Sequence, residues 1–478
     1  MATKVVVLGA GPGGYVAAVR AAQRGADVTV IESDKLGGTC LNRGCIPSKV
    51  LITTAELLEK FHRAEAYGIR TDGHVQVNMQ RLMARKAAVV GTQIKGIGAL
   101  FKHHRIRLVQ GYGRIAAHGR LAVTAANGRT VEVPWDRLIL ATGTRPMEIP
   151  ALAFDGRDIL SSDHALNLEQ VPASILIVGG GVIGCEFACL LAALGSRVTV
   201  VEALARLLPL PSVDADCSKV LQREMKKRKI KFFVDRSVQR VDRADGKLQV
   251  TIGPSPFSET PAEKAKPPLT LAVDKVLVCV GRTANTDAIG LEHIGLKTDA
   301  RGWIEADAHM QTGVRGVYAV GDILGPDRIM LAHVASREGI VAADRLMGAD
   351  AKMDYAAVPG AIFTSPEVAN VGLTESRARE QGRDIRADSV LMRTLGKAQV
   401  MGDIAGQAKI VSEAGSGRVL GVHLVGARAT ELIAEAALAV RLGASVTDLA
   451  ETIHAHPTLA EIMPEAAYKA LDMALHAS

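Results

Sequence analysis

The chain contains the same succession of a strand, a glycine-rich turn, a helix and a second strand twice. The first copy begins with an expected strand at Lys4–Leu8, and the second with an expected strand at Ile175–Val178. The turn glycines are Gly9, Gly11 and Gly14 in the first copy and Gly179, Gly181 and Gly184 in the second. Such glycines let the backbone approach a pyrophosphate, which also meets the positive end of the helix. We therefore expect an α/β fold with two Rossmann-like, dinucleotide-binding domains.

An acidic residue ends the second strand of each copy, Glu32 in the first and Glu202 in the second. A carboxylate at this place accepts hydrogen bonds from ribose hydroxyls. Glu202 would repel the additional phosphate of NADP, so NAD is the expected nicotinamide cofactor, although the nearby Arg206 leaves NADP open. Two dinucleotide sites in one chain indicate that electrons pass between two carriers. The alternative is that the glycine turns only allow close packing of helix and strand and bind no nucleotide.

The length, charge and cysteine count of the chain limit the class of protein to which it can belong. A chain of 478 residues exceeds the size of one hydrophobic core, so two to four domains are expected. The formal charge is +7, but lysines and arginines are scattered along the chain, which favours general solvation over a nucleic-acid partner. Six cysteines are too few for a secreted disulfide scaffold, and no apolar stretch is typical of a membrane span. We expect a cytoplasmic protein that binds no nucleic acid.

Cys40 and Cys45 stand five residues apart in the segment Gly37–Lys49. In a regular helix their Cα atoms would be about 8–9 Å apart, whereas a disulfide needs less than about 7 Å. A bridge therefore requires a distorted turn, which Gly44 permits, and a strained small ring is easily reduced. Two free buried thiols or a metal pair are the alternatives, but no further zinc ligands stand nearby and no metal is expected. The remaining cysteines are expected to be buried in helices or strands: Cys185, Cys189, Cys217 and Cys279.

A segment near the C-terminus contains His454, His456 and Glu461. Histidine titrates near neutral pH and can take a thiol proton, and a carboxylate partner would fix its tautomer and raise its basicity. The sequence leaves open which histidine Glu461 reaches. Together with the cysteine pair, this segment makes thiol chemistry plausible.

Further elements follow from periodicity and turn residues. Between the two units we expect helices at 55–66 and 77–100, the first able to begin near Pro47, and short strands over 106–133. The proline-rich segment 254–268 is expected to be an exposed hairpin loop. From about Asp350 the composition changes to strands followed by helices from Ala429, which indicates a separate C-terminal α+β domain.

These motifs resemble the pyridine nucleotide-disulfide oxidoreductases, and within them the branch that oxidises dihydrolipoamide. The resemblance covers nearly the whole chain and extends to Ala141–Gly143, Gly281-Arg282 with Asn285, Tyr318–Asp322, Met330–His333 and His456-Pro457 with Glu461. It implies an FAD domain at 1–148, an NAD domain at 149–277, a central domain at 278–349 that completes the FAD site, and a dimerisation domain at 350–478.

The resemblance also implies an activity. Protein-bound dihydrolipoamide would be oxidised to lipoamide through a Cys40–Cys45 disulfide and FAD, and NAD⁺ would be reduced to NADH. Cys40 would be the interchange thiol and Cys45 the charge-transfer thiol beside the flavin. The active form would be a homodimer, in which His456 and Glu461 serve the cysteines of the partner subunit. The expected partners are lipoyl-bearing proteins of 2-oxoacid dehydrogenase complexes or of the glycine cleavage system, and net positive charge would aid an encounter with acidic carriers.

The resemblance also implies which residues contact each cofactor. The expected FAD set is Gly9, Gly11, Gly14, Glu32, Lys49, Thr142, Gly143, Asp322 and Ala332. The expected NAD set is Gly179, Gly181, Gly184, Glu186, Glu202 and Gly281. Lys49 and Glu186 match an ion pair beside the flavin, and Asp322 matches the residue that holds the ribityl chain.

The sequence departs from the family at two places and leaves other functions open. Ser365 stands where relatives often have histidine, and the insertion at 254–268 is unusual. An enzyme of the glutathione reductase type is one alternative, and a non-catalytic nucleotide-binding redox sensor is another. Mercuric reductase is disfavoured, because no paired cysteines stand at the C-terminus.

Overall fold

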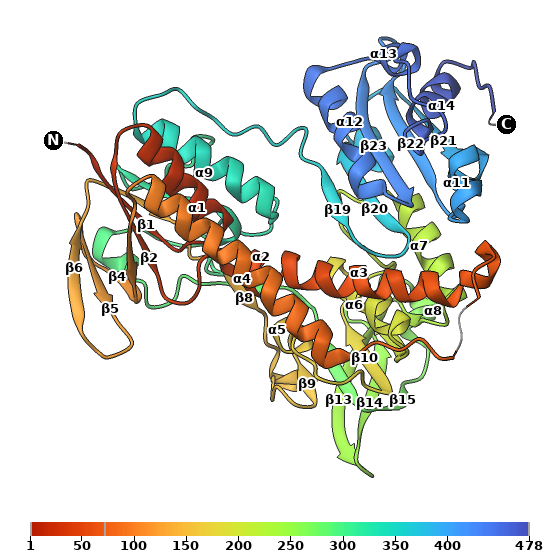
Figure 1. Cartoon of the computed structure of the whole chain (residues 1–478), viewed down its shortest axis with the longest axis horizontal. Coiled ribbons are helices and arrows are strands. Elements are labelled where there is room, and N and C mark those ends of the chain that lie inside the picture. The colour runs from red at the N-terminus through yellow and green to blue at the C-terminus, as the bar shows by residue number, and fades with distance from the viewer. Residues whose placement is uncertain (1, 71–72, 477–478) are drawn as a thin grey trace.

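The structure is a computed structural model that describes residues 2–70 and 73–476 (Figure 1). Its first Rossmann unit is a parallel sheet in the order β18-β7-β1-β2-β3, with α1 packed against α9. The elements of this unit are β1 (Lys4–Leu8), α1 (Pro12–Gln23), β2 (Asp27–Glu32), β3 (Arg107–Gln110), β7 (Arg137–Leu140), β18 (Val317–Ala319) and α9 (Ala332–Leu346). The predicted strand, turn, helix and strand at the N-terminus are confirmed.

Three helices connect β2 to β3 in this first unit, and they carry the cysteine pair. They are α2 (Gly38–Arg43), α3 (Cys45–His62) and α4 (Met79–His103), with the short 3-10 helix η1 (Ala64–Tyr67) after α3. The two helices expected at 55–66 and 77–100 are present, but α3 begins ten residues earlier than the expected start at 55. Its first half is rich in β-branched residues, and burial against the second unit outweighs their weak helix propensity.

The second unit repeats this architecture. Its parallel sheet has the order β12-β11-β10-β16-β9. The elements are β9 (Ile159–Leu160), α5 (Ser162–Ala165), β10 (Ser174–Val178), α6 (Val182–Ala193), β11 (Arg197–Val201), α7 (Ala215–Lys227), β12 (Lys231–Phe233) and β16 (Lys275–Val278). Cys185, Cys189 and Cys217 are buried as expected. The expectation for Cys279 is wrong: it follows the end of β16 beside the glycine turn and is half-buried.

Each unit also carries a three-stranded antiparallel sheet. One consists of β4 (Tyr112–Ala117), β5 (Arg120–Thr124) and β6 (Thr130–Pro134), and the other of β13 (Arg236–Ala244), β14 (Lys247–Pro254) and β15 (Leu269–Val273). The proline-rich segment 254–268 connects β14 to β15 as a hairpin, which confirms that prediction, and it contains the short helix α8 (Pro261–Lys264). The chain enters the second unit through β8 (Thr144–Pro146) and leaves it through β17 (Arg282–Ala284), which pair antiparallel. The second unit is thus inserted into the first.

The C-terminal domain is an antiparallel sheet covered by helices. The strand order is β19 (Gly360–Ile362), β20 (Glu367–Gly372), β23 (Val419–Gly426), β22 (Gln407–Glu413) and β21 (Ile385–Leu391). The helices are α10 (Glu375–Glu380), α11 (Gly396–Met401), α12 (Ala429–Leu442), α13 (Val446–Glu451) and α14 (Ile462–Ala470). Short 3-10 helices elsewhere are η2 (Pro150–Leu152), η3 (Leu291–Ile294), η4 (Gly321–Leu324) and η5 (Met392–Thr394). The predicted fold class, two Rossmann-like domains and a C-terminal α+β domain, is confirmed.

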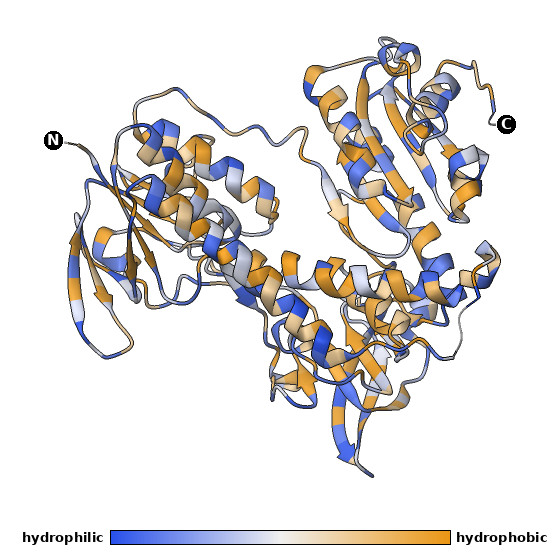
Figure 2. Cartoon of the chain, in the orientation of Figure 1, coloured by the Kyte–Doolittle hydropathy of each residue, from blue (hydrophilic) through white to orange (hydrophobic). Residues whose placement is uncertain are grey.

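The central strands of each sheet form the cores. Every residue of β10 and β23 is buried, and Figure 2 shows apolar residues concentrated on the inner strands. The parallel sheets are covered on both faces, so their strands are continuously apolar rather than alternating. Across the described residues, no helix combines the length and the apolar character required to cross a bilayer.

Candidate active site

The first glycine turn leads from β1 into the N-terminus of α1. Gly11 is the N-cap of α1 and supplies no side chain to cap the helix, so the first-turn amides are open to an anionic group. Glu32 at the end of β2 accepts hydrogen bonds from the amides of Ala10 and Asp34, both at 2.8 Å. The acid therefore fixes the turn as well as offering oxygen atoms to a ribose.

The second turn has the same geometry. Gly181 is the uncapped N-cap of α6, and Glu202 accepts hydrogen bonds from the amides of Gly180 (2.5 Å) and Leu204 (2.8 Å). Arg206, which left NADP open, donates from both terminal guanidinium nitrogens to backbone carbonyls of its own loop. Those carbonyls belong to Leu208 (2.8 Å), Leu210 (3.1 Å) and Val213 (2.9 Å). These hydrogen bonds hold the Arg206 guanidinium within its own loop and occupy its N–H donors, which favours NAD over NADP.

The helix is interrupted at Gly44, and this interruption brings the two cysteines together. Helix α2, with Cys40, ends there, and α3 begins at Cys45. A Cβ atom on Gly44 would lie 3.0 Å from the carbonyl oxygen of Thr39 and 3.3 Å from the Cα atom of Cys40. Only a residue without a side chain lets the start of α3 approach α2 so closely. The distorted turn at Gly44 agrees with the sequence expectation, and both cysteines are free thiols in the structure.

The two thiols share a proton unequally. A hydrogen bond from the Cys40 thiol, reinforced by the positive charge of Lys49, lowers the pKa of Cys45 to about 7, although burial opposes this. The same hydrogen bond, together with burial, raises the pKa of Cys40 well above its ordinary value. Near neutral pH the Cys45 sulfur is therefore substantially a thiolate, and Cys40 holds the proton.

Lys49 lies one helical turn beyond Cys45 and joins three parts of the molecule. Its Nζ atom donates to both carboxylate oxygens of Glu186 on α6, at 3.0 and 2.9 Å. Glu186 is buried and also accepts from the amide of Phe363, whose ring centre lies 4.3 Å from the Lys49 Nζ atom. The ion pair expected from the family is present, and it connects the cysteine helix to the second unit and to the C-terminal domain.

A half-buried carboxylate, Asp322, lies where β7 and β18 end side by side. Burial raises the pKa of Asp322, which accepts a 3.2 Å hydrogen bond from the Thr144 hydroxyl. That hydroxyl accepts a 2.6 Å hydrogen bond from Arg282. These roles of Thr144 and Arg282 were not predicted, because they depend on contacts between residues 138 and 178 positions apart.

Two further groups support the same region. Glu338, buried on α9, accepts hydrogen bonds of 2.7 Å from the amide of Gly321 and from the Tyr355 hydroxyl, and burial raises its pKa to about 7. The expected residue Thr142 is tied to Asn285, whose amide nitrogen donates to the Thr142 carbonyl at 3.0 Å. Glu338 also went unpredicted, although an acid on the apolar face of a helix is a usable signal.

The remaining expected residues lie around these groups. Gly143 has a left-handed backbone conformation with φ +64°, and no atom lies within 4 Å of the place where a Cβ atom would stand. Gly281 follows β16 and accepts from the amide of Met147 at 3.0 Å. Ala332 is the first residue of α9, whose N-terminus has no side-chain cap. All three lie at or near the carboxyl ends of the parallel strands, where ligands bind in such folds.

The C-terminal acid–base pair consists of His456 and Glu461. The Nδ1 atom of His456 is 2.7 Å from Oε1 of Glu461, while Glu461 Oε2 accepts from the amide of Thr458 at 2.8 Å. The side chain of His456 is 76% exposed, whereas that of His454 is 8% exposed and pairs with Glu435. The structure thus selects His456 as the histidine that Glu461 reaches.

Within one chain the histidine and the cysteines do not meet. His456 lies between α13 and α14 at one end of the C-terminal domain, and Figure 1 shows this segment well separated from α2. No described contact joins His456 to Cys40 or Cys45. An exposed acid–base pair that is remote from its own thiols fits an arrangement in which it serves a second subunit.

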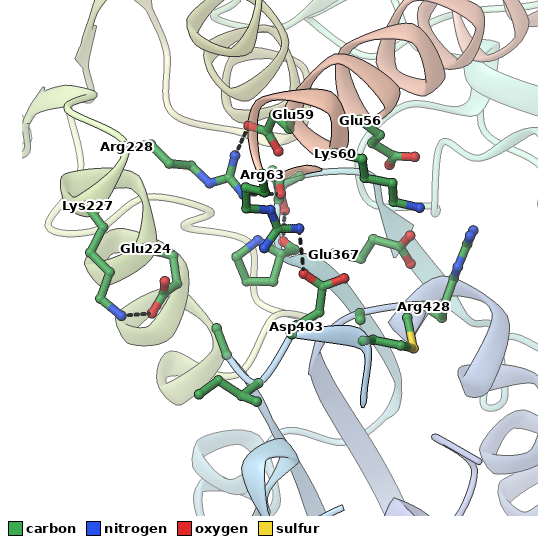
Figure 3. Close-up of a pocket in the computed structure, with 18 residues that line it drawn as sticks. Glu56, Glu59, Lys60, Arg63, Glu224, Lys227, Arg228, Glu367, Asp403 and Arg428 are labelled. Atoms are coloured by element: carbon green, nitrogen blue, oxygen red, sulfur yellow. Dashed lines mark hydrogen bonds and ion pairs between the residues drawn. The ribbon is translucent and has the colours of Figure 1, made fainter. Parts of the chain in front are cut away.

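A separate pocket of about 310 Å³ lies between α3, α7 and the C-terminal domain (Figure 3). It contains none of the expected catalytic or cofactor residues. Its walls are joined by the ion pairs Arg63–Asp403 (3.0 Å), Lys227–Glu224 (2.9 Å) and Arg228–Glu59. Ser365, the departure from the family noted above, lies here and accepts a 2.6 Å hydrogen bond from Arg228. Ser365 therefore contributes to contact between domains rather than to the thiol site.

Comparison with known proteins places this geometry in a family. The family model described as pyridine nucleotide-disulphide oxidoreductase matches residues 3–339, and the model of the dimerisation domain of such enzymes matches residues 358–467. The chain belongs to the pyridine nucleotide-disulphide oxidoreductases. A dimerisation domain of this kind supports a homodimer.

Several curated members of the family are similar over their full length. The chain is 40% identical to a dihydrolipoyl dehydrogenase of Bacillus subtilis, with 100% of both chains covered. It is 40% identical to that of Haloferax volcanii, over 99% of this chain and 97% of the relative, and 37% identical to the mitochondrial enzyme of Pisum sativum, over 99% and 92%. The named relatives thus come from bacteria, archaea and plants.

Solved structures of the family share the fold. LpdA from Mycobacterium tuberculosis has a TM-score of 0.88 at 30% identity, with 98% of this chain and 99% of that chain covered. The HOCl-induced flavoprotein disulfide reductase RclA from Escherichia coli, as a Cu(II) complex, has a TM-score of 0.84 at 26% identity, covering 98% and 99%. The architecture is therefore common to members with different names.

The residues of this pyridine nucleotide-disulphide oxidoreductase fit the family's cofactors, FAD and NAD. Two uncapped helix N-termini, on α1 and α6, offer amides to two pyrophosphates. Asp322 is a half-buried carboxylate that accepts only from Thr144 among the described residues, so it has capacity left for a polyol hydroxyl. The chain is accordingly an NAD-linked flavoprotein oxidoreductase.

Proposed function

We propose that this protein is a cytoplasmic dihydrolipoamide dehydrogenase. It oxidises lipoyl groups carried by proteins of 2-oxoacid dehydrogenase complexes or of the glycine cleavage system, and it reduces NAD⁺. The observation that carries the proposal is the cysteine pair: Cys45 has a pKa of about 7 beside a protonated Cys40 and the Lys49 ammonium. Sparse cysteines suit a reducing compartment.

The first half-reaction uses the oxidised Cys40–Cys45 pair. His456 of the partner subunit takes a proton from one thiol of dihydrolipoamide, and the resulting thiolate attacks the Cys40 sulfur, so that the cysteine disulfide breaks and Cys45 leaves as a thiolate. The second substrate thiol then attacks the first substrate sulfur, closing lipoamide and releasing Cys40. Of the two substrate protons, one ends on Cys40 and one on His456. Glu461 holds His456 in the tautomer that accepts the proton at Nε2.

The second half-reaction depends on keeping Cys45 ionised. The hydrogen bond from Cys40 and the charge of Lys49 stabilise the Cys45 thiolate, and Glu186 fixes the position of Lys49. Bound FAD would supply two-electron transfer from the cysteine pair to NAD⁺, and as the electrons leave, Cys40 would lose its proton and the Cys40–Cys45 disulfide would form again. Glu32 and Glu202 would orient the two ribose groups, and Asp322 and Thr144 would hold the polyol chain of the flavin.

Turnover with free dihydrolipoamide tests the proposal. We expect NADH formation that depends on dihydrolipoamide and is abolished in Cys45→Ser and Cys40→Ser, while both variants retain flavin. Cys189→Ser is the matched control, because this thiol is buried on α6 and has no role in the reaction. Lipoamide-dependent turnover that survives in Cys45→Ser would refute the proposal.

A second candidate is reduction of another disulfide or oxidant at the expense of a nicotinamide nucleotide. It is favoured by the similarity to RclA, a flavoprotein disulfide reductase. The loop carbonyls that hold Arg206 argue against NADPH as its donor. A rate with glutathione disulfide and NADPH exceeding that with lipoamide and NADH would favour this second function.

A further inference from the structure

The positive charge of the chain is concentrated rather than evenly spread. Residues 73–131 contain ten lysines and arginines and no aspartate or glutamate, although the whole chain has 57 basic and 50 acidic residues. This segment includes α4, β3, β4 and β5, and it ends within β6 before Glu132. The local excess exceeds the net charge of +7 of the whole chain.

Four of these cations form a strip along α4. Arg81, Arg85, Lys95 and Lys102 are all exposed, and at 100° per residue they fall within a face about 100° wide. Since they extend over 21 residue steps, the strip is about 32 Å long. None of the four forms an ion pair with any residue in the described parts of the chain. Figure 2 shows hydrophilic positions recurring along this helix.

Several basic residues on other helices have an acidic partner on the same helix. On α7, Lys219 pairs with Asp216 at 3.0 Å and Lys227 with Glu224 at 2.9 Å, and on α10 Arg379 pairs with Glu375. Unpaired like charges on one face repel one another, so the strip on α4 is electrostatically unfavourable for the isolated chain. It becomes favourable when an acidic surface covers it.

The helix that carries the strip packs beside the thiol site. Helix α4 packs against both α2, which carries Cys40, and α3, which begins with Cys45. The inner face of α4 is anchored in the core of the first unit by Ile97 and Phe101, and the four basic residues of the opposite face are exposed. An acidic partner seated on α4 would therefore hold an attached flexible arm next to the cysteine pair.

We propose that the α4 strip, defined by Arg81, Arg85, Lys95 and Lys102, is the docking surface for an acidic lipoyl-carrying domain. This inference rests on the proposed function and deepens it, because it names the surface that receives the carrier rather than the dithiol. The strip raises the rate of encounter with the carrier and contributes nothing to the chemistry of the bound dithiol. Free dihydrolipoamide, which is uncharged, is indifferent to it.

The test is a neutral variant, Arg81→Gln/Arg85→Gln/Lys95→Gln, compared with the wild-type flavoprotein. Glutamine is a good helix former at exposed positions, so α4 is expected to stay folded. The substrates are free dihydrolipoamide and a dihydrolipoyl carrier domain of net negative charge. We expect kcat/KM with the carrier to fall about five-fold or more, and with free dihydrolipoamide to change less than about two-fold. The fall of the wild-type kcat/KM with added salt should be weaker in the variant.

A control removes the same charge elsewhere. Lys297→Gln/Arg315→Gln/Lys352→Gln neutralises three exposed cations outside α4, and within the described residues these three form no ion pair. This control should keep the wild-type kcat/KM for the carrier within about two-fold. Equal losses in both variants would mean that only net charge matters and would overturn the proposal.

Further outcomes separate competing partners. If the wild-type protein oxidises neither substrate, the proposed function is wrong. If it oxidises free dihydrolipoamide, and the rate with the carrier is the same in the wild type and in the α4 variant, only the docking surface is wrong. A variant that becomes monomeric on size-exclusion chromatography would make the strip a subunit contact. A variant that loses binding to duplex DNA while keeping the carrier rate would make it a nucleic-acid surface. Each of these last two results would also overturn the proposal.

Discussion

The two Rossmann units have nearly superimposable turns but different surroundings. In both, a Cβ atom on the third glycine, Gly14 or Gly184, would lie 1.9 Å from the carbonyl oxygen of the first glycine. They differ in what lies beside the middle glycine. A Cβ atom on Gly11 would lie 3.9 Å from the Cα atom of Gly38 on α2, and one on Gly38 would lie 2.6 Å from the Cα atom of Gly11, whereas a Cβ atom on Gly181 in the second unit would have no neighbour within 4 Å.

This difference separates a retained cofactor from an exchanged one. The first turn is closed by α2, the helix that also brings Cys40 to the site, so a dinucleotide held there is enclosed next to the thiols. The second turn is open, as a substrate that enters and leaves requires. We therefore expect one turn geometry to serve FAD as a fixed group and NAD as a substrate, depending on what covers the turn.

The largest expected effect comes from disturbing the covered turn. Gly38→Ala places a Cβ 2.6 Å from Gly11 Cα at a residue with φ +56°. We expect a loss of about 3 kcal/mol or more in unfolding free energy and purified protein with little flavin. Flavin absorbance and thermal unfolding measure the two effects.

The matched variant in the open turn is Gly181→Ala. Because nothing lies within 4 Å and φ is −73°, the added methyl group is expected to leave flavin content and stability unchanged and to raise only the KM for NAD⁺. Equal flavin loss in Gly38→Ala and Gly181→Ala would remove the distinction between the two turns.

The next effect concerns the ion pair that connects the units. Lys49 lowers the pKa of Cys45 from its ordinary value, and Glu186 raises it. Lys49→Gln should therefore move the pKa of Cys45 above about 7, so that the thiolate appears only at higher pH. Glu186→Gln should move it below that value, so that the thiolate persists to lower pH.

Alkylation of the reduced protein by iodoacetamide as a function of pH follows this thiolate. All variants carry Cys40→Ser in addition, which removes the Cys40 sulfur, so that Cys45 is the residue of the pair that is alkylated. Shifts of the same sign in Lys49→Gln and Glu186→Gln would contradict the electrostatic account.

A smaller effect is expected at the acids of the two turns. Each carboxylate accepts two backbone hydrogen bonds, so Glu202→Gln should weaken NAD⁺ binding about ten-fold, or about 1.4 kcal/mol, with flavin retained. Glu32→Gln should speed flavin release and leave the KM for NAD⁺ unchanged. Stopped-flow release of flavin and steady-state kinetics measure the two effects. Faster flavin release in Glu202→Gln together with a higher KM for NAD⁺ in Glu32→Gln would show that the sites are assigned to the wrong cofactors.

The sequence was sufficient to predict the duplicated units, because their signals are local. Strand, glycine turn, helix and acid lie within about thirty residues, and the structure confirms β1 and β2 with the predicted bounds. The break at Gly44 was predictable for the same reason, since helix geometry alone forbids a bond between cysteines five residues apart. By contrast, the predicted domain boundaries and site roles stay predictions.

The parts that the sequence did not predict depend on distant contacts. The start of α3 was left open between residue 55 and Pro47, because its β-branched first half has weak helix propensity and packs against the second unit, which the sequence does not reveal. Thr144 and Arg282 meet Asp322 only after the inserted unit returns the chain through β17. Cys279 was expected to be buried, but its strand ends one residue before it.

Anaerobic reduction of the flavin-loaded protein by dihydrolipoamide tests the central claim most directly. That claim is that the Cys45 thiolate, formed when the dithiol reduces the cysteine pair, lies against the flavin. The account predicts a long-wavelength charge-transfer absorption that appears on reduction in the wild type, is absent in Cys45→Ser and is restored to the oxidised spectrum by NAD⁺. An unchanged spectrum in the wild type, or the same new band in Cys45→Ser, would contradict it.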